Sequence, residues 1–322
     1  MSAATRTTAG TAQGAAPPAV PTAGHTAEQP AAGRPGHGPG TEEPTGGPDA
    51  TDATEATEAT EATEATEGAS SVWEPAAGTV VRGTVLLLPG RGEHPRVYGR
   101  FGRRLAFDGY RVVATLPEPP AALADRIAEA RAALPDGAPV VLAGSDTGAL
   151  HALAAAEAAG PDALLLAGLP TGPSDIAVPS ATSTPPAVEP ADPDAELTDR
   201  SACPVHRGLL AADPDYRPGA LTEPVPARLA EAAESAAPAR PVLVLHGAAD
   251  PVSPPATAHR HAARLGAELV LVTDGRHDAL NDAPHRSVAA AVVQWLERLR
   301  GGPHLPAQLT TVTPAPAEGT PA

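Results

Sequence analysis

The sequence contains no lysine, one cysteine, one methionine and few aromatic side chains: two Trp, three Tyr and two Phe among 322 residues. The single cysteine, Cys203, cannot form a disulfide within the chain or a cysteine-based metal site. All 22 basic residues are arginine, and 38 Asp and Glu residues give a net charge of −16. An acidic chain without a basic stripe is a poor match for nucleic acid. We therefore expect no nucleic-acid partner.

The sequence also has no long hydrophobic run. Its N-terminus lacks an apolar segment of the kind found in signal peptides, and no stretch of 18 apolar residues follows. These absences predict a chain without a membrane span, and we expect it in the cytoplasm.

Large apolar side chains are almost absent from residues 1–71, which consist mainly of Ala, Thr, Gly, Pro and Glu. Within them, residues 53–67 are five consecutive Ala-Thr-Glu triplets. A three-residue period has no apolar face to bury, so this segment is predicted to be disordered. The tail at 303–322 has a similar composition. The sequence therefore predicts one folded domain at 72–302 between two disordered tails.

Apolar runs alternate with helical patterns inside this domain. The strands are expected at 85–88, 110–114, 140–143, 163–167, 242–246 and 268–273, and the helices at 96–107, 121–134, 147–159, 205–210, 226–236, 255–265 and 284–300. The alternation predicts an α/β fold with a mostly parallel sheet and helices on both faces. A Pro-, Ser- and Asp-rich stretch at about 168–240 is too long for an ordinary connection. We expect it to be an insertion that forms a lid.

Polar side chains follow three of the expected strands, at the sheet edge where ligands bind in such folds. One strand runs into Gly144-Ser145-Asp146-Thr147-Gly148, where two glycines flank a tight turn before a helix. This is the arrangement of a nucleophile elbow, with Asp146 at its centre. Asp250 and His277 follow later strands. The order of elbow residue, acid and histidine is that of α/β-hydrolases.

Four segments between about residues 78 and 300 carry a family resemblance. They are Pro89-Gly90-Arg91-Gly92-Glu93-His94 with Tyr98, the elbow, His246-Gly247-Ala248-Ala249-Asp250-Pro251-Val252, and His277-Asp278-Ala279-Leu280-Asn281-Asp282. The chain resembles the α/β-hydrolase superfamily, and is most similar to its monoacylglycerol lipase and lysophospholipase group, also called serine aminopeptidase S33-like. That group usually has His-Gly-x-Gly-Glu-His, His-Gly-x-x-Asp-x-Val and His-Glu-x-x-Asn-Glu in the first, third and fourth segments.

The resemblance implies a hydrolase of a small or medium apolar molecule that needs no cofactor and no metal. His277 would be the catalytic base, and Asp250 would orient it. The backbone N–H groups of Arg91 and Thr147 would form the oxyanion hole. Asp146 would take the place of the nucleophile. The sequence does not predict the oligomeric state.

Asp146 is the main departure from that group, which carries serine at the elbow centre. An ionised aspartate can attack a saturated carbon, so a hydrolase that uses Asp146 is the first hypothesis. A serine-type esterase that uses the neighbouring Ser145 is the second, although adjacent side chains at a tight turn point in different directions. The third is a non-catalytic ligand-binding protein, in which Asp146 forms a structural ion pair with Arg91 or His277.

Overall fold

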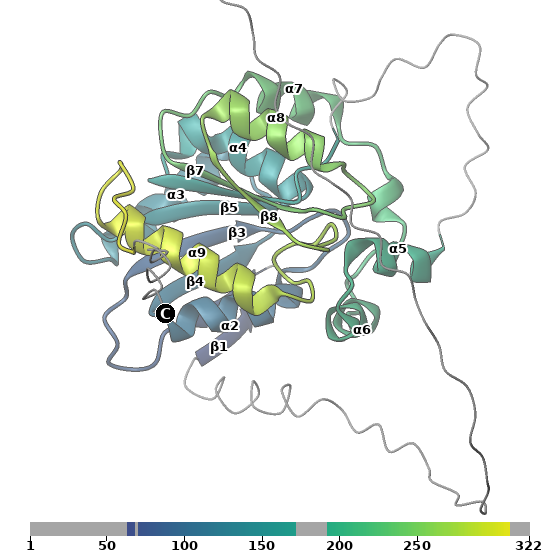
Figure 1. Ribbon diagram of the computed structural model, residues 1–322. Helices are drawn as coiled ribbons and strands as arrows, with labels where there is room; N and C mark the ends of the chain where they lie inside the picture. The colour runs from purple at the N-terminus through teal and green to yellow at the C-terminus, as the bar shows by residue number, and fades with distance from the viewer. Residues whose placement is uncertain (1–62, 68–69, 172–191, 310–322) are drawn as a thin grey trace, which may run out of the picture. The chain divides into compact units, whose positions relative to one another are not determined.

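The computed structural model describes residues 63–67, 70–171 and 192–309 (Figure 1). The disorder predicted for residues 1–62 and 310–322 lies outside the described residues, and so does the 172–191 part of the predicted insertion. All described residues belong to the unit Asp49–Ala322, whereas the unit Met1–Pro48 lies outside them.

A sheet of eight strands, in the order β1-β2-β4-β3-β5-β6-β7-β8, organises the described residues. The strands are β1 (Thr63–Glu67), β2 (Ser70–Glu74), β3 (Gly83–Leu88), β4 (Tyr110–Thr115), β5 (Val140–Ser145), β6 (Ala163–Ala167), β7 (Val242–Gly247) and β8 (Glu268–Val272). All neighbouring strands from β4 to β8 are parallel, and β1 and β2 are antiparallel at one edge. The six strands expected from the sequence, β3 to β8, are all present and all run parallel, so the prediction of a mostly parallel sheet is confirmed.

The folded part starts earlier than the predicted boundary at residue 72. Strand β1 lies within the Ala-Thr-Glu triplets, and its backbone pairs with β2 from Thr63 opposite Glu74 to Glu67 opposite Ser70. Backbone pairing needs no apolar face, which is why the composition gave no sign of this strand. Strand β2 in turn pairs with β4 and places Trp73 in the core, where its side chain is fully buried.

The folded part also extends past the predicted end at residue 302. Leu305 packs against the core, and the Gln308 side-chain amide donates to the carbonyl oxygen of Glu297 at 2.7 Å. Tertiary contacts with α9 (His285–Arg300), and not local composition, hold these residues in place.

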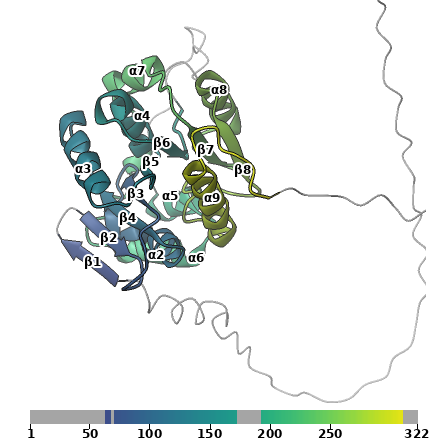
Figure 2. The same cartoon turned by 90° about the vertical axis from the view of Figure 1, so that its left-hand side faces the viewer.

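Helices cover both faces of the sheet, as predicted (Figure 2). One face is covered by α2 (Gly99–Phe107) and α9 (His285–Arg300), and the other by α3 (Pro120–Ala132), α4 (Thr147–Ala159), α7 (Ala227–Ser235) and α8 (Pro255–Leu265). The stretch expected to be one helix at 96–107 is divided into the 3₁₀ turn η2 (Pro95–Tyr98) and α2. Across the described ranges, no helix combines the length and the apolar character needed to cross a bilayer.

Each central strand sends alternate side chains to the two faces. In β3, Val85 and Leu87 pack with α2 and α9, whereas Leu86 and Leu88 pack with α3 and α4. Because helices cover both faces, the central strands are unbroken apolar runs in the sequence. The strand bounds expected from these runs therefore lie close to the observed ones. The parallel arrangement brings the carboxyl ends of β5, β7 and β8 to one edge of the sheet.

The name insertion is used for residues 192–240, the longer of the two described parts of the interruption predicted at about 168–240. It contains α5 (Pro193–Arg200), α6 (Pro204–Ala212), η3 (Ala220–Thr222) and α7. The sequence predicted α6 and α7 but not α5. Helix α7 packs against α4, whereas the end of α5 meets the loop after β8: the Asp278 N–H donates to the Arg200 carbonyl oxygen at 2.8 Å. The insertion therefore reaches the edge where the predicted site residues lie.

Candidate active site

Asp146 occupies the sharp turn between β5 and α4. Its backbone has φ 49° and ψ −123°, a conformation that a non-glycine residue rarely adopts. The turn depends on its flanking glycines, because a Cβ on Gly148 would lie 2.1 Å from the Leu88 carbonyl oxygen and one on Gly144 would lie 2.2 Å from Gly148 itself. This tight turn lifts the Asp146 side chain off the sheet, as the elbow pattern predicts.

His277 lies between two carboxylates. Its Nε2 is 3.3 Å from Asp146 Oδ1, and its Nδ1 is 2.8 Å from Asp250 Oδ2. All three side chains are buried, and none is more than 1% exposed. The structure therefore brings together the three residues that the chain order suggested. An imidazole held between two acids can receive, hold and release a proton at either nitrogen.

Asp250 is held in place by its own loop. Its Oδ1 accepts the N–H groups of Val252 and Ser253 at 2.8 and 3.0 Å, which leaves Oδ2 for His277. His246, at the end of β7, is fully buried, and its Nε2 lies 2.9 Å from the Ser253 carbonyl oxygen. This packed histidine shapes the turn, so Asp250 has a fixed orientation relative to the imidazole.

Ser145 points away from this group of residues. Its side chain is buried and hydrogen-bonds the phenol of Tyr98. Because successive side chains diverge at the elbow, it is Asp146 that lies within hydrogen-bond reach of His277. The serine-type hypothesis has no geometric support in this conformation.

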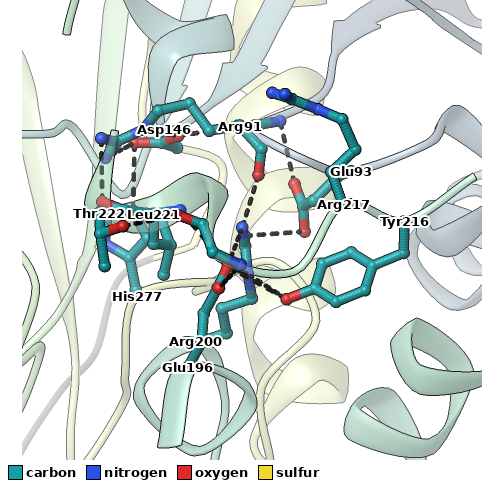
Figure 3. A network of polar contacts seen from close by, with 12 residues as sticks. Arg91, Glu93, Asp146, Glu196, Arg200, Tyr216, Arg217, Leu221, Thr222 and His277 are labelled. Carbon is teal, nitrogen blue, oxygen red and sulfur yellow. Dashed lines mark hydrogen bonds and ion pairs between the residues drawn. The ribbon is translucent and has the colours of Figure 1, made fainter. Parts of the chain in front are cut away.

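Arg91 contributes its side chain as well as its backbone. Its backbone N–H, at the position expected for the oxyanion hole, donates to Asp146 Oδ2 at 2.9 Å. Its guanidinium binds the same carboxylate, with Nε 2.8 Å from Oδ2 and Nη2 2.9 Å from Oδ1 (Figure 3). Thr147 begins α4, so its N–H belongs to the first helical turn, where amides lack a partner within the helix. The ion pair between Arg91 and Asp146, raised from the sequence only as an alternative, is present.

Two cations and two carboxylates set the electrostatics of the site. Burial opposes ionisation of Asp146, but hydrogen bonds from His277 and Arg91 outweigh it and hold the pKa of Asp146 far below its ordinary value. Burial alone would lower the pKa of His277, yet the charges of Asp250 and Asp146 raise it to about 10. At neutral pH the site therefore holds an imidazolium between two carboxylates, with the guanidinium beside it.

A second arginine, Arg200 at the end of α5, joins the insertion to the site (Figure 3). Its Nη2 donates to the Arg91 carbonyl oxygen and to Glu196 Oε1. Its Nη1 lies 3.8 Å from Glu93 Oε1 and 3.6 Å from Asp278 Oδ1, and the side chain is fully buried. Sequence reasoning missed this residue. The only signal was the acid Glu196 four positions earlier, a spacing that places both on one helix face.

Glu93, His206 and Asp278 have ligand atoms within 4.8 Å of one another, close enough for a metal site. Arg200 already supplies a cation to this cluster. In addition, burial and the nearby Asp278 charge raise the pKa of Glu93 to about 8, and the Tyr98 hydroxyl donates to this carboxyl. A guanidinium and a proton therefore compensate the buried acids, and the cluster does not fit a metal ion.

An open cavity of ≈ 770 Å³ adjoins the elbow. Its wall includes Gly90, Arg91, His94, Arg96, Thr147 and Arg217, together with the apolar Leu116 and Pro117. The cavity therefore opens beside Arg91 and Thr147, the residues expected to form the oxyanion hole. Its wall therefore combines apolar surface with three arginine side chains, Arg91, Arg96 and Arg217.

Comparisons with known proteins agree with this fold. A family model described as the alpha/beta hydrolase family matches residues 85–291. Monoglyceride lipase from Saccharomyces cerevisiae, solved as a soluble variant with a substrate analogue, is 15% identical with a TM-score of 0.52, over 73% of this chain and 94% of that one. A lipase in its open form is 19% identical with a TM-score of 0.53, over 72% and 94%. A thermostable carboxyl esterase from Bacillus coagulans is 16% identical with a TM-score of 0.51, over 74% and 99%. No curated protein matches the sequence.

At these identities the solved structures show a shared fold. The family model goes further, because it matches more than half of the chain and includes the elbow, Asp250 and His277. The chain belongs to the alpha/beta hydrolase family and, as a member of it, is a hydrolase.

Proposed function

We propose that this hydrolase acts by covalent catalysis at Asp146 on a small or medium-sized substrate. The observation that carries the proposal is the alignment at the elbow: Asp146 Oδ1 lies 3.3 Å from His277 Nε2, and Asp250 holds the other imidazole nitrogen at 2.8 Å. An aspartate is ionised at neutral pH and needs no base to become a nucleophile. The histidine then serves the second, hydrolytic step.

In the first step, a carboxylate oxygen of Asp146 attacks a saturated carbon of the substrate. A new carbon–oxygen bond forms as the bond between that carbon and the leaving group breaks, and the leaving group departs with the electron pair. The product is a neutral alkyl ester on Asp146. Oδ2 already accepts the Arg91 backbone N–H, so this donor is in place for the carbonyl oxygen of the ester.

The ester changes the protonation of His277. In the free protein, the charges of Asp250 and Asp146 raise the pKa of His277 to about 10. Esterification removes one of these charges, so the pKa falls and the neutral imidazole becomes available as a base. Esterification of Asp146 therefore converts His277 into the base that the hydrolytic step needs.

In the second step, His277 takes a proton from water, and the resulting hydroxide attacks the ester carbonyl carbon. The N–H groups of Arg91 and Thr147 stabilise the oxyanion, and donors of this kind typically contribute about 3 kcal/mol each. The intermediate collapses with cleavage of the bond between the carbonyl carbon and the ester oxygen, and the departing alkoxide takes the proton from His277. Asp146 then loses its remaining proton to solvent.

The test is turnover on panels of haloalkanes, epoxides and p-nitrophenyl esters. Asp146→Ala and His277→Ala should abolish turnover, and His277→Ala should accumulate an adduct on Asp146 that is visible by intact mass. Ser145→Ala is the matched control and should keep most of the activity, because that side chain faces Tyr98. Full activity in Asp146→Ala would contradict the proposal. A ligand-induced thermal shift with no turnover on any panel would favour the ligand-binding alternative.

A further inference from the structure

The Asp146 carboxylate has no free acceptor position in this structure. A carboxylate offers about four such positions, two on each oxygen. Oδ2 accepts the backbone N–H and the Nε–H of Arg91, at 2.9 and 2.8 Å. Oδ1 accepts the Nη2–H of Arg91 at 2.9 Å and faces His277 Nε2 at 3.3 Å. With four donors on four positions, Asp146 cannot attack a carbon until one donor leaves.

The Arg91 side chain is the donor group that is able to leave. Its backbone is fixed, because Arg200 donates to the Arg91 carbonyl oxygen and the Arg217 N–H donates to the Gly92 carbonyl oxygen. The guanidinium lies on a long side chain, 11% exposed, at the wall of the open cavity. Rotation of the side chain would free one acceptor position on each oxygen of Asp146 and leave the backbone N–H in place.

A guanidinium that releases Asp146 needs another anionic partner. Its Nη1 donates to the carbonyl oxygens of Leu221 and Glu223 in the insertion, at 3.1 and 2.5 Å, but neutral carbonyls do not compensate its charge (Figure 3 shows Leu221). Loss of one partner from a nearly buried ion pair is strongly unfavourable. The planar fork of arginine matches a two-oxygen anion, and the group it now binds is a carboxylate. Exchange for a second carboxylate therefore preserves the most binding.

The cavity beside Arg91 can supply the place for that anion. Its acidic wall residues, Glu93 and Asp215, are already engaged: Asp215 pairs with Arg96, and Glu93 accepts two hydrogen bonds from neighbouring residues. Arg217, also in the wall, has a surface carboxylate partner of its own. Arg91 is thus the wall arginine whose present partner is the reacting group itself.

We infer that the substrate carries a carboxylate, which takes Arg91 from Asp146 and thereby releases the nucleophile. Arg91 is then the specificity-determining residue, because a neutral substrate leaves Asp146 saturated. The inference rests on the proposed use of Asp146 as the nucleophile. It replaces the apolar substrate implied by the resemblance with a small organic carboxylate, whose reacting carbon lies near its anionic group.

Equilibrium binding tests this exchange without turnover. Butyrate and its neutral analogue butyramide are titrated into the full chain by calorimetry at constant ionic strength. Butyrate should bind at least about tenfold more tightly, which corresponds to about 1.4 kcal/mol. Arg91→Met keeps most of the side-chain length without the charge and should lose this preference. Arg131→Met, at an exposed ion pair on α3, is the matched control and should keep it.

Asp146→Asn supplies the second arm of the test. Asparagine keeps the size of the side chain but removes the carboxylate that competes for Arg91, so butyrate should bind about tenfold more tightly than to the unsubstituted protein. Equal affinity of butyrate for the two proteins would overturn the inference, and so would equal binding of butyrate and butyramide. A preference for inorganic phosphate over butyrate would overturn the assignment to a carboxylate. If butyrate behaves as expected but Asp146→Ala keeps full turnover, the covalent mechanism fails while the anion site stands.

Discussion

Arg200 of the insertion and Asp278, the residue after His277, are joined twice. The Nη1 of Arg200 lies 3.6 Å from Asp278 Oδ1, and the Asp278 N–H donates to the Arg200 carbonyl oxygen at 2.8 Å. Glu93 and Glu196 are the other acidic neighbours of this guanidinium. One buried cation therefore serves three acids, which come from the loop at 89–94, the insertion and the loop after β8.

Arg200→Met should strongly destabilise the fold. Removal of the cation leaves buried acids without compensation, and loss of one partner from such a cluster typically costs about 3–5 kcal/mol of the free energy of unfolding. Urea denaturation followed by circular dichroism measures this. Arg131→Met, which breaks an exposed pair with Asp162, should cost about 1 kcal/mol or less. Similar small losses in both variants would contradict the role given to Arg200.

Glu93 should make stability fall as the pH rises. Burial and the Asp278 charge raise the pKa of Glu93 from 4.5 to about 8. Above about pH 4.5 the unfolded chain loses this proton while the folded state keeps it, so the contribution is full below that pH and is lost as the pH approaches about 8. Each unit of pKa shift corresponds to about 1.4 kcal/mol.

Glu93→Gln cannot ionise and should flatten this slope in urea denaturation between about pH 5 and pH 8. Glu118→Gln is a suitable control, because a hydrogen bond from Arg126 lowers the pKa of Glu118 and it stays ionised throughout that range. The same slope in Glu93→Gln and the unsubstituted protein would show that Glu93 does not carry the effect.

The pKa of His277 should depend on Asp146. In the folded protein the pKa of His277 is raised from 6.5 to about 10. The protonated imidazole therefore stabilises the fold fully below about pH 6.5, and this contribution is lost as the pH rises through about 10. Asp146→Asn removes one of the two charges and should lower this pKa by at least about one unit. Nitrogen NMR of histidine-labelled protein at a series of pH values measures this pKa. The signal that is absent from His277→Gln is assigned to His277. An unchanged pKa of His277 in Asp146→Asn would contradict the proposal that esterification of Asp146 makes His277 a base.

Gly148 should not tolerate a side chain. A Cβ there would lie 2.1 Å from the Leu88 carbonyl oxygen and 2.5 Å from that of Pro89, so Gly148→Ala should cost about 2–3 kcal/mol of unfolding free energy. A Cβ on Gly208 in α6 would meet nothing within 4 Å, and Gly208→Ala should stabilise the helix by about 0.5–1 kcal/mol. Opposite signs in thermal denaturation confirm that the elbow depends on close backbone approach.

Asp146→Ser should create ester hydrolysis. Serine at this position would place a hydroxyl within reach of His277, with the Arg91 backbone N–H beside it. Because a positioned base typically contributes about 100-fold or more, p-nitrophenyl acetate hydrolysis should exceed that of Asp146→Ala by about this factor. Addition of His277→Ala should remove the gain. A serine variant no faster than the alanine variant would mean that the elbow geometry differs from that described.

The sequence predicted most of the sheet because its strands are buried on both faces. Such strands must be continuous apolar runs, and β3, β5, β6 and β7 are runs of this kind. Edge strand β1 was missed, since it depends on backbone pairing with β2 and not on an apolar pattern. Helix α5 was missed because its composition is that of a loop, and Arg200 gains its importance only from partners distant in sequence.

By itself, the sequence determined the fold and the elbow, because strand periodicity and closely spaced glycines are local properties. It also placed Asp146, Asp250 and His277 at the ends of parallel strands, which must meet at one edge of the sheet. Only the tertiary structure decided that the Arg91 side chain closes on Asp146, and that Arg200 joins the insertion to the site. These contacts link residues 55 and 109 positions apart. They follow from side-chain conformation and from burial of charge, which no local pattern encodes.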